Sequence, residues 1–347
     1  MLFEIIKNKN FEDHKVIISF YDKTTSLKGF IAIHNINLGP ALGGTRFWEY
    51  SNEEEALNDV LNLSKIMTRK CILAGLKAGG GKGVIIKDKN VRKTKGLLYK
   101  YAEVVNLLNG NFYTGEDAGL SERDIEILKE RSRFILGTRP NKPSYWTALG
   151  VFYSIKAALK YLFLDSKIKN RTFAIRGLGK VGFNLLELII KSGGKVIASE
   201  INKKIIKDVK NKYPQVEIVE PEKIHTLKVD VYSPCSLGYE LNERTVRKLN
   251  CKIICGGSNN QLESEDLGWE LYKRGIIYVP DYLANSGGLI SVYEELNQKG
   301  YFQKRVMSKI KNMGKKVTEI LRLSEKLKKP TNFITEDLIR KIPRKYK

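Results

Sequence analysis

Hydrophobic and polar positions in the first 140 residues predict strands separated by helices. Two strand-like runs, Val-Ile-Ile-Ser-Phe-Tyr and Phe-Ile-Ala-Ile-His, flank a polar turn between residues 15 and 34. Ser51 and three consecutive glutamates introduce apolar residues at helical spacing, which predicts a helix ending near Lys70. A glycine loop at 79–81 and a strand at 84–86 follow. Further elements expected here are a helix over 93–108, a strand from Phe112 and a helix from Ser121.

From residue 147 onward, predicted strands and helices alternate. Helices are expected over 147–161 and 183–191. Strand-like segments occur at 172–175, 195–198, 229–232, 253–255 and 277–279. This alternation is typical of a doubly wound α/β fold with a parallel sheet.

The length of 347 residues favours two domains, because a single hydrophobic core seldom extends over so long a chain. The proline-rich stretch at 138–144 is the expected connection. We therefore predict a first domain over 1–143, a Rossmann-type second domain over 144–328, and a basic tail over 329–347 that packs back on the first domain.

The formal net charge of +23 raises the question of nucleic-acid binding. The densest basic stretch runs from Lys304 to Lys347, with fifteen lysines and arginines against four acidic residues. It has no interleaved aromatics and no recognition signature. Basic residues are otherwise spread along a lysine-rich chain, so compositional bias explains the charge as well, and we expect no specific nucleic-acid partner.

Cysteine and histidine usage argues against a metal site. The four cysteines include no Cys-x-x-Cys pair and the three histidines are scattered, whereas zinc needs clustered ligands. No apolar run reaches the length of about 18 residues that spans a bilayer. The first residues lack the order of a signal peptide. We expect no metal, no membrane association and a cytoplasmic location.

A glycine-rich motif predicts a dinucleotide site. Gly177-Leu178-Gly179-Lys180-Val181-Gly182 lies between a predicted strand and a predicted helix, and Glu200 follows 23 residues after the first glycine. Such glycines let a pyrophosphate reach the helix N-terminus, and a carboxylate at that distance accepts from a ribose hydroxyl. It also repels a 2′-phosphate, so NAD is favoured over NADP, although Lys203 and Lys204 nearby soften the preference. A glycine turn without a ligand is the alternative.

A second glycine-rich segment points to lysine chemistry. Gly79-Gly-Gly-Lys82 follows Lys70 by twelve residues, and glycines remove side chains that would shield the Lys82 ammonium from a substrate. A second ammonium nearby, with partial desolvation, would make Lys82 usable as a base. The segment is not a nucleotide P-loop, because Gly83 stands where serine or threonine is needed. A solvated lysine after a turn is the alternative.

Together these motifs resemble the glutamate/leucine/phenylalanine/valine dehydrogenase superfamily, especially its leucine and phenylalanine branch, over roughly residues 1–330. The resemblance depends on the following segments: Gly39-Pro-Ala-Leu-Gly-Gly-Thr-Arg46, Met67-Thr-Arg-Lys70, Gly79-Gly-Gly-Lys82, Tyr113-Thr-Gly-Glu-Asp117, Gly177-Leu-Gly-Lys-Val-Gly182, Gly257-Ser-Asn-Asn-Gln261 and Pro280-Asp-Tyr-Leu-Ala-Asn-Ser-Gly-Gly288. It implies a catalytic and oligomerisation domain with a mixed sheet, an NAD-binding Rossmann domain, a cleft between them, and a homo-oligomer, either a dimer or an octamer.

The resemblance further implies reversible oxidative deamination of an L-amino acid to a 2-oxo acid, ammonium and NADH. Lys70 would bind the substrate carboxylate, Lys82 would be the general base, and Asp117 would hold the amine and shuttle protons. Further substrate-binding positions implied are Leu42, Gly43, Gly44, Gly115, Asn260, Leu289 and Val292. Besides the glycine-rich loop and Glu200, the implied cofactor positions are Thr147, Cys235, Ser236, Asn259 and Arg46.

Pocket positions favour a bulky apolar substrate. Glutamate enzymes of this superfamily have a lysine in place of Leu42 and a hydroxyl residue in place of Val292, so a buried γ-carboxylate would lose both partners. Gly115 replaces the alanine of leucine enzymes and would enlarge the pocket by a methyl group, as would fit phenylalanine. Phenylalanine and leucine both remain open. The alternatives are a tryptophan or other aromatic dehydrogenase in a biosynthetic pathway and an inactive NAD-binding member.

Overall fold

The computed structural model describes residues 5–88, 91–137, 142–236 and 238–341. These residues form two compact units. The first comprises the described residues up to 137 together with Glu295–Gly300, and the second runs from Lys142 to Glu294 and from Tyr301 onward. The predicted connection at 138–144 lies partly outside the described residues, and its last two residues already belong to a helix.

A mixed sheet forms the centre of the first unit. Its strands are β1 (Val16–Asp22), β2 (Leu27–Asn35), β3 (Ala41–Leu42), β4 (Thr45–Trp48), β5 (Gly79–Ile86) and β6 (Phe112–Tyr113). The order is β1-β2-β5-β3-β6, with β4 also paired to β5. The pairs β1–β2 and β2–β5 are antiparallel, whereas β3 and β4 run parallel to β5. The predicted mixed sheet is confirmed.

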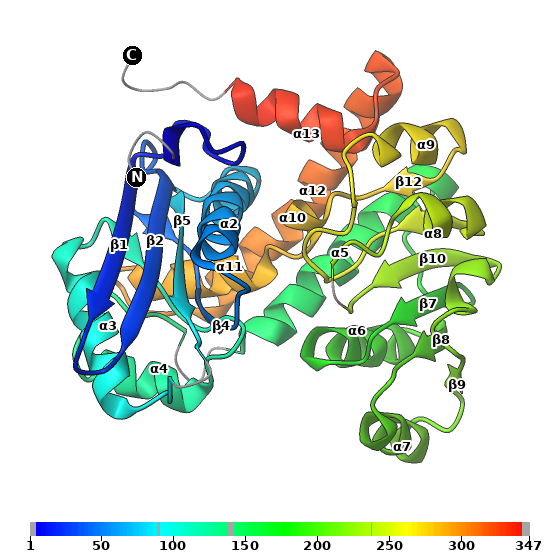
Figure 1. The fold of residues 1–347 in the computed structure, drawn as a ribbon. Helices are drawn as coiled ribbons and strands as arrows, with labels where there is room; N and C mark the ends of the chain where they lie inside the picture. Colours follow the sequence, from blue (N-terminus) through cyan, green and yellow to red (C-terminus); the bar gives the residue numbers. More distant parts are fainter. Residues whose placement is uncertain (1–4, 89–90, 138–141, 237, 342–347) are drawn as a thin grey trace. The chain divides into compact units, whose positions relative to one another are not determined.

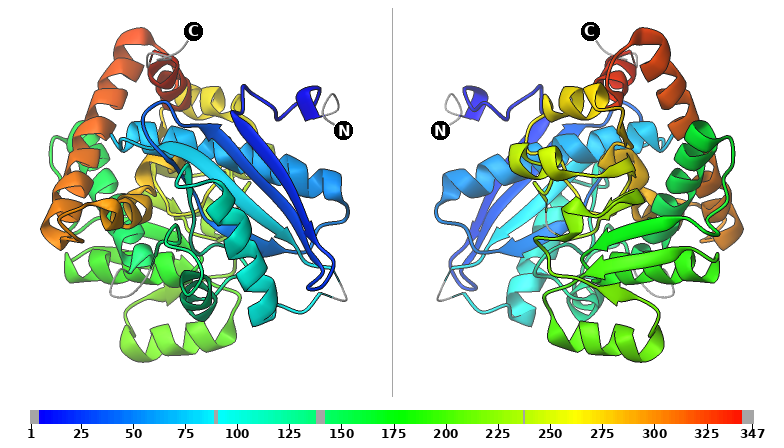
Figure 2. Two further views of the ribbon diagram at one scale, coloured as in Figure 1. Left: turned by 90° about the vertical axis from the view of Figure 1, so that its left-hand side faces the viewer. Right: turned by 90° about the vertical axis from the view of Figure 1, so that its right-hand side faces the viewer.

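Helices cover this sheet on both faces. They are α2 (Glu53–Leu73), α3 (Lys95–Leu107) and α4 (Glu122–Lys129). Helix α2 lies along β5 and β2, as Figure 2 shows. It begins after Asn52, whose side chain accepts from the Glu55 N–H, and the three glutamates of its first turn suit the helix dipole. The helix predicted from Ser51 to Lys70 is therefore correct within three residues at its C-terminal end.

The second unit is built on a six-stranded parallel sheet. Its strands are β7 (Thr172–Arg176), β8 (Lys195–Ser199), β9 (Glu217–Ile218), β10 (Val229–Pro234), β11 (Cys251–Ile254) and β12 (Ile277–Tyr278). They lie in the order β12-β11-β10-β7-β8-β9, and every pair is parallel (Figure 1). The chain moves outward from β7 to β9 and then returns to the other side of β7, so the order reverses between β7 and β10. This is the predicted doubly wound fold.

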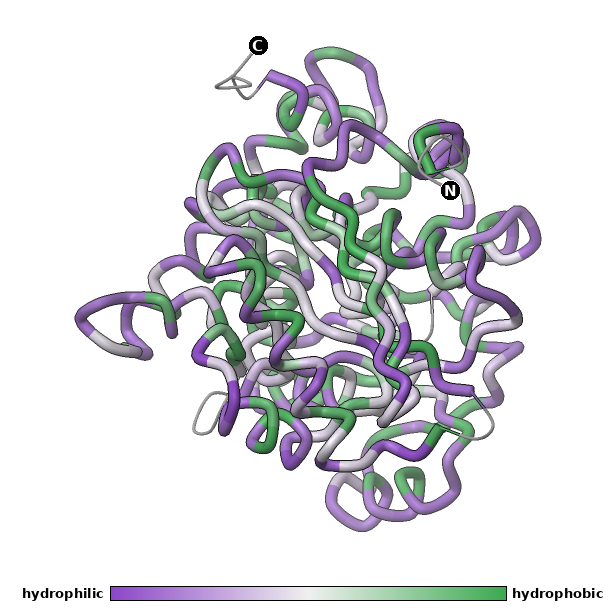
Figure 3. The backbone as a smooth tube through the Cα atoms, turned by 60° about the vertical axis from the view of Figure 1, so that its left-hand side comes forward, coloured by the Kyte–Doolittle hydropathy of each residue, from purple (hydrophilic) through white to green (hydrophobic). Residues whose placement is uncertain are grey.

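Helices enclose the second sheet and extend the unit. They are α5 (Pro143–Phe163), α6 (Lys180–Lys191), α7 (Lys203–Lys212), η1 (Ile224–Thr226), α8 (Glu243–Lys248), α9 (Leu267–Lys273), α10 (Asp281–Ala284), α11 (Gly287–Tyr293), α12 (Gln303–Leu327) and α13 (Thr331–Arg340). The short helix η2 (Glu294–Leu296) begins at Glu294 of this unit and continues into residues of the first unit. Along the surface helices, short hydrophobic and hydrophilic stretches follow one another (Figure 3), as expected for helices with one buried face and one exposed face.

The C-terminal segment differs from its predicted position. Helix α13 packs on α9, β12 and α12, all in the second unit. Thr331 donates to the Tyr278 carbonyl at 2.5 Å, and the Asn332 amide donates to Glu265 at 2.7 Å. The described part of the tail therefore belongs to the second unit and not to the first, because α13 has its own polar contacts there. Residues 342–347 lie outside the described residues.

Candidate active site

Lys82 lies in the middle of β5, a strand that is buried along its whole length. Only 5% of the Lys82 residue surface is exposed. The glycines before it belong to the strand and not to the predicted loop. A Cβ at Gly80 would lie 2.1 Å from the Thr68 nitrogen of α2, and one at Gly81 would lie 2.7 Å from the Phe112 ring. These glycines therefore let α2 and Phe112 pack against the strand, and they do not leave open space around Lys82.

Asp117 is the partner of Lys82. It follows β6 in the chain, and its Oδ2 forms an ion pair with the Lys82 Nζ. Its Oδ1 accepts the Ala118 N–H at 2.7 Å. Burial raises the pKa of Asp117, but the charges of Lys82 and Arg46 outweigh this effect and hold the pKa well below its ordinary value of 3.8. The structure thus brings the two predicted catalytic residues together, with Asp117 as a carboxylate.

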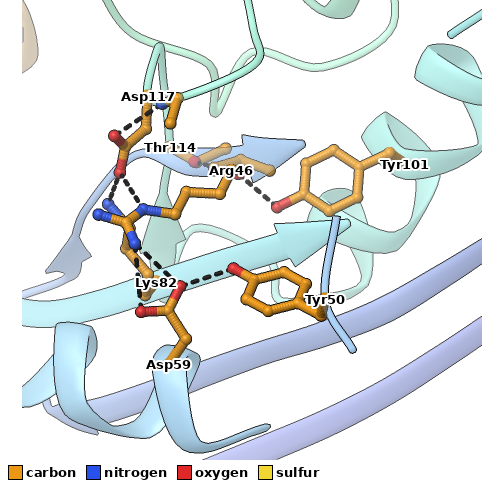
Figure 4. A network of polar contacts seen from close by, with 9 residues as sticks. Arg46, Tyr50, Asp59, Lys82, Tyr101, Thr114 and Asp117 are labelled. Carbon is orange, nitrogen blue, oxygen red and sulfur yellow. Dashed lines mark hydrogen bonds and ion pairs between the residues drawn. The ribbon is translucent and has the colours of Figure 1, made fainter. Parts of the chain in front are cut away.

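Arg46 contacts Asp117 and also a second acidic residue, Asp59 (Figure 4). The Arg46 Nε lies 3.4 Å from Asp117 Oδ2, and its NH1 donates to both oxygens of Asp59, at 3.1 and 2.9 Å. Tyr50 donates to Asp59 at 2.6 Å, and burial together with this bond raises the pKa of Tyr50 above its ordinary value of 10. Arg46 was predicted at the cofactor. The structure places Arg46 beside Lys82 and Asp117 and links it to Asp59 and Tyr50, two residues that the sequence analysis missed.

Lys70 lies in the last turn of α2. Residues of α2 at helical spacing face β5: Thr68 adjoins Gly80, and the Cys71 thiol lies 3.1 Å from the Gly79 carbonyl. Lys70 shares the side of the helix with Met67, three residues earlier, and Met67 adjoins Gly43. Lys70 and Lys82 therefore come from neighbouring elements, as the sequence predicted.

Three predicted substrate-site glycines are close-packing positions. A Cβ at Gly43 would lie 1.8 Å from the Gly81 oxygen, and one at Gly44 would lie 2.9 Å from the Asp117 Cβ. A Cβ at Gly115 would lie 2.6 Å from the Leu136 oxygen. The extra methyl of an alanine at Gly115 would therefore meet backbone and not a pocket, so the argument that Gly115 enlarges the pocket loses its physical support. Leu42 is fully buried in β3.

The glycine-rich loop has the geometry that a pyrophosphate requires. Gly177 has a φ of +89°, which favours glycine. A Cβ at Gly179 would meet nothing within 4 Å, so the N-terminus of α6 is open. A Cβ at Gly182 would lie 1.9 Å from the Gly177 oxygen, so this glycine allows α6 to approach the strand. Leu178, Lys180 and Val181 complete the loop and the first turn of α6. The residues fit a dinucleotide.

Glu200 follows β8 and touches this loop. Its Oε2 accepts the Leu178 N–H at 2.7 Å, and its Oε1 accepts the N–H groups of Ile201 and Asn202 at 2.8 and 2.9 Å. Backbone donors thus fix the carboxylate beside the loop at the edge of the sheet, where a ribose hydroxyl can still donate to a remaining lone pair.

Other predicted positions of the second unit form two groups. Thr147 donates to the Pro143 carbonyl at 2.9 Å and adjoins Gly288, which ties the start of α5 to α11. Leu289 and Val292 are half-buried and share one side of α11. The second group surrounds the loops after β10 and β11 and contains Cys235, Ser236, Asn259 and Asn260. Burial raises the pKa of the Cys235 thiol to about 12, so it is a thiol and not a nucleophilic thiolate.

Asn285 is a site residue that the predicted list omitted. Its amide nitrogen donates to the Ser258 carbonyl at 3.1 Å and to the Asn259 side chain at 3.0 Å. Its Oδ1 is buried without a hydrogen-bond partner among the described residues. An orphaned buried acceptor at this place suits an amide donor such as that of a nicotinamide. The motif Pro280–Gly288 contained the signal.

The described residues contain no group of three or more histidine, cysteine, aspartate or glutamate side chains that could hold a metal ion. In the same part of the chain, no helix is both long and apolar enough to cross a bilayer.

Two family models match this chain. The model described as "Glu/Leu/Phe/Val dehydrogenase, dimerisation domain" matches residues 14–133. The model described as "Glutamate/Leucine/Phenylalanine/Valine dehydrogenase" matches residues 141–203 and 199–336. The chain belongs to this family. Its members are dehydrogenases that generally depend on a nicotinamide cofactor. The family predicted from the motifs is thereby confirmed.

Relatives in the family are named as dehydrogenases of apolar amino acids. Leucine dehydrogenase of Thermoactinomyces intermedius is 37% identical over 90% of this chain and 86% of its own length. Phenylalanine dehydrogenase of Lysinibacillus sphaericus is 38% identical over 89% of this chain and 83% of its own. The prediction of an oxidoreductase that acts on amino acids is confirmed at the level of this family.

A solved structure of the family has the same fold. The L-tryptophan dehydrogenase of Nostoc punctiforme matches with a TM-score of 0.83 and 36% identity, covering 97% of each chain. The hetero-hexameric glutamate dehydrogenase of Thermus thermophilus matches with a TM-score of 0.77 at 19% identity, which supports the fold alone. The predicted fold class, a two-domain α/β dehydrogenase, is confirmed.

Proposed function

We propose that the protein is an NAD-dependent L-amino acid dehydrogenase for a bulky apolar substrate. The overall reaction converts an L-amino acid, NAD⁺ and water to a 2-oxo acid, ammonium, NADH and a proton, and it is reversible. The observation that carries the proposal is the ion pair between the buried Lys82 and the partly buried Asp117 in a chain of this family. Removing these charges from water costs free energy, which makes the pair a weak source of stability and a candidate for a functional role.

Substrate binding uses charges on neighbouring elements. Lys70 provides a point charge for the substrate carboxylate, and Asp117 accepts hydrogen bonds from the substrate amine. Asp117 is suited to this because its pKa is held low and it stays anionic near neutral pH. Lys82 and Arg46 already converge on its Oδ2, so the substrate amine competes with these two cations for the same carboxylate.

Lys82 is the proposed base. When bound, NAD⁺ would supply the acceptor for the hydride of the substrate α-carbon. Lys82 would take a proton from the water that adds to the substrate carbon, once it has given up the proton that it holds in the ion pair with Asp117. Asp117 carries a proton from the resulting hydroxyl to the departing amine, so the C–N bond breaks and the carbonyl forms. Burial of Lys82 excludes bulk water from this exchange.

NAD is the proposed cofactor because of the open glycine-rich loop and the fixed Glu200 carboxylate. A negative charge beside the ribose repels the 2′-phosphate of NADP. Asn285 offers its free Oδ1 to the nicotinamide amide, with Asn259 beside it.

The substrate class follows from Leu42 and Val292, which offer no partner to an acidic side chain. Relatives named for leucine, phenylalanine and valine support an apolar substrate. Tryptophan or another aromatic amino acid is a second candidate, favoured by the likeness to L-tryptophan dehydrogenase over 97% of both chains. We also propose a homo-oligomer, a dimer or an octamer, through the first unit, which matches the dimerisation-domain model, and a cytoplasmic location.

The test is NADH formation, followed at 340 nm in alkaline buffer, with leucine, valine, isoleucine, methionine, phenylalanine, tyrosine, tryptophan and glutamate. Turnover of apolar amino acids but not of glutamate, and with NAD above NADP, is the expected result. Highest turnover of tryptophan would establish the second candidate. No turnover of any amino acid, with NADH still bound, would indicate an inactive member and contradict the proposal.

A further inference from the structure

Glu240 is a buried carboxylate that the proposed reaction does not use. Its side chain is 1% exposed, although it lies in the loop region after β10. Its Oε2 accepts from the Ser236 hydroxyl at 2.8 Å and lies 3.3 Å from Arg176 NH1. Its Oε1 faces His225 Nε2 at 3.4 Å. Because a buried charge is costly unless paired, the position of Glu240 demands an explanation.

The partners of Glu240 come from both sides of the point where the strand order reverses. Arg176 is the last residue of β7, and Ser236 follows β10, the next strand in the sheet. The two segments touch: the Cys235 N–H donates to the Arg176 carbonyl at 2.7 Å, and a Cβ at Gly177 would lie 2.9 Å from the Ser236 Cα. Ligands of doubly wound sheets bind in the crevice at this point.

Geometry also assigns the half of the dinucleotide that Ser236 would meet. The glycine-rich loop between β7 and α6 takes the pyrophosphate, and Glu200 after β8 takes the adenosine ribose. Strand β10 lies on the opposite side of β7 from β8. A dinucleotide that crosses the loop therefore presents its nicotinamide ribose on the side of Ser236.

The carboxylate decides how Ser236 can interact with that ribose. A serine hydroxyl has one proton to donate, and an ionised carboxylate can only accept. Since Glu240 takes this proton, Ser236 Oγ presents only lone pairs to a ligand. It is thus a fixed acceptor for a hydroxyl donor. Arg176 supplies the counter-charge for the buried Glu240 carboxylate.

We propose that Glu240 is a positioning residue which, paired with Arg176, orients Ser236 to accept a hydrogen bond from a hydroxyl of the nicotinamide ribose. This inference rests on the proposed NAD-dependent function. It predicts that Glu240 acts on dinucleotide affinity through Ser236 and has no effect on the adenosine half of the cofactor.

The test measures NADH binding by fluorescence titration and AMP binding by calorimetry in Ser236→Ala, Glu240→Gln and the double variant. Each single variant is expected to weaken NADH binding about 10-fold, the worth of one hydrogen bond. The double variant should be no weaker than the worse single variant, because Glu240 is proposed to act only through Ser236. AMP affinity should stay constant, which a general disruption of the unit would not allow. Glu243→Gln, at an exposed glutamate of α8, is the matched control.

Unchanged NADH affinity in Glu240→Gln, or losses that multiply in the double variant, would overturn the inference. If Glu240→Gln unfolds at lower temperature, the pair Arg176→Met with Glu240→Leu replaces it, because removing both charges avoids an unpaired one. This pair should bind AMP normally and NADH about 10-fold more weakly; normal NADH affinity would again overturn the inference. Failure of the unaltered protein to bind NADH would instead contradict the proposed function.

Discussion

The Arg46 guanidinium donates to both carboxylate oxygens of Asp59, and the same guanidinium approaches Asp117 at 3.4 Å. Asp59 therefore offsets part of the positive charge that Arg46 brings to the catalytic carboxylate. Arg46 lies between Asp59 and Asp117, and its position sets how the Asp117 carboxylate is shared between Arg46 and Lys82.

Asp59→Asn should lower kcat about 10-fold while changing KM less. Without the Asp59 charge, Arg46 is free to pair more closely with Asp117, and small displacements of a catalytic group are costly in rate. Steady-state kinetics with the preferred amino acid measures the effect. Tyr50→Phe, which removes only the hydrogen bond to Asp59, is the milder control. Equal kcat in Asp59→Asn and the unaltered protein would disprove this role.

Gly115→Ala should destabilise the first unit by about 1–3 kcal/mol and leave the substrate preference unchanged. The added Cβ would lie 2.6 Å from the Leu136 oxygen, so backbone has to shift. Gly96→Ala is the matched control, since its Cβ would have no atom nearer than 3.7 Å and alanine favours the helix. Chemical denaturation and the amino-acid panel give the two readouts. A stable variant with altered preference would restore the pocket interpretation of Gly115.

His34 should make the protein less stable as pH falls from about 7 to 4. Burial, followed by the charge of His14, lowers the pKa of His34 from its ordinary 6.5 to about 4. The unfolded chain thus binds a proton near pH 6.5 and the folded chain only near 4, so stability is lost between these values. The loss is at most about 3 kcal/mol.

Unfolding free energies of the unaltered protein and of His34→Asn, compared across this pH range, isolate the contribution of His34. Asparagine can still reach the Thr68 hydroxyl that His34 Nδ1 contacts at 2.9 Å. The difference between the two proteins should shrink or reverse toward pH 4. A difference that does not depend on pH would contradict the assignment.

Glu294→Ala should destabilise the second unit by about 3 kcal/mol, and Glu295→Ala should cost less. The Glu294 side chain is 1% exposed and pairs with Arg305 and Lys309, both in the second unit. Glu295 belongs to the first unit, where it is more exposed and accepts the Gly137 N–H. Removal of Glu294 leaves two cations without their shared partner, whereas removal of Glu295 takes away a 3.9 Å ion pair with Lys129 and the hydrogen bond from Gly137. Unfolding free energies are measured by chemical denaturation. A larger loss of stability in Glu295→Ala than in Glu294→Ala would contradict this prediction.

Much of the fold could be predicted from the sequence, because the spacing of hydrophobic residues indicates which face of a helix or strand is buried. Helix α2, the alternating second unit and the glycine-rich loop all follow from local patterns. The strand β5 was missed at its start, because Gly79–Gly81 have no side chains to show strand character and their need for glycine comes from α2 and Phe112.

The candidate site was less predictable where it depends on tertiary contacts. Lys82 and Asp117 are 35 residues apart, and only the motifs suggested that they meet. Asp59 and Tyr50 lie outside the recognised motifs. The pairing of Glu240 with Arg176 could be predicted only with the strand order of the sheet known, because it depends on β7 and β10 being neighbours. Whether a side chain at position 115 would meet a pocket or backbone depends on the tertiary structure around Gly115, which the sequence does not show.

The most direct test of the account is Lys82→Ala, with turnover and NADH binding measured on the same preparation. Truncating Lys82 to alanine should leave the fold and NADH affinity intact. The glycines of β5 keep their packing against α2 and Phe112, and Arg46 still pairs with Asp117. We predict loss of at least about 10³-fold in kcat, as expected for removal of the general base, with NADH bound as in the unaltered protein. Retained turnover with a bulky apolar amino acid would contradict the assignment of Lys82 and the mechanism built on it.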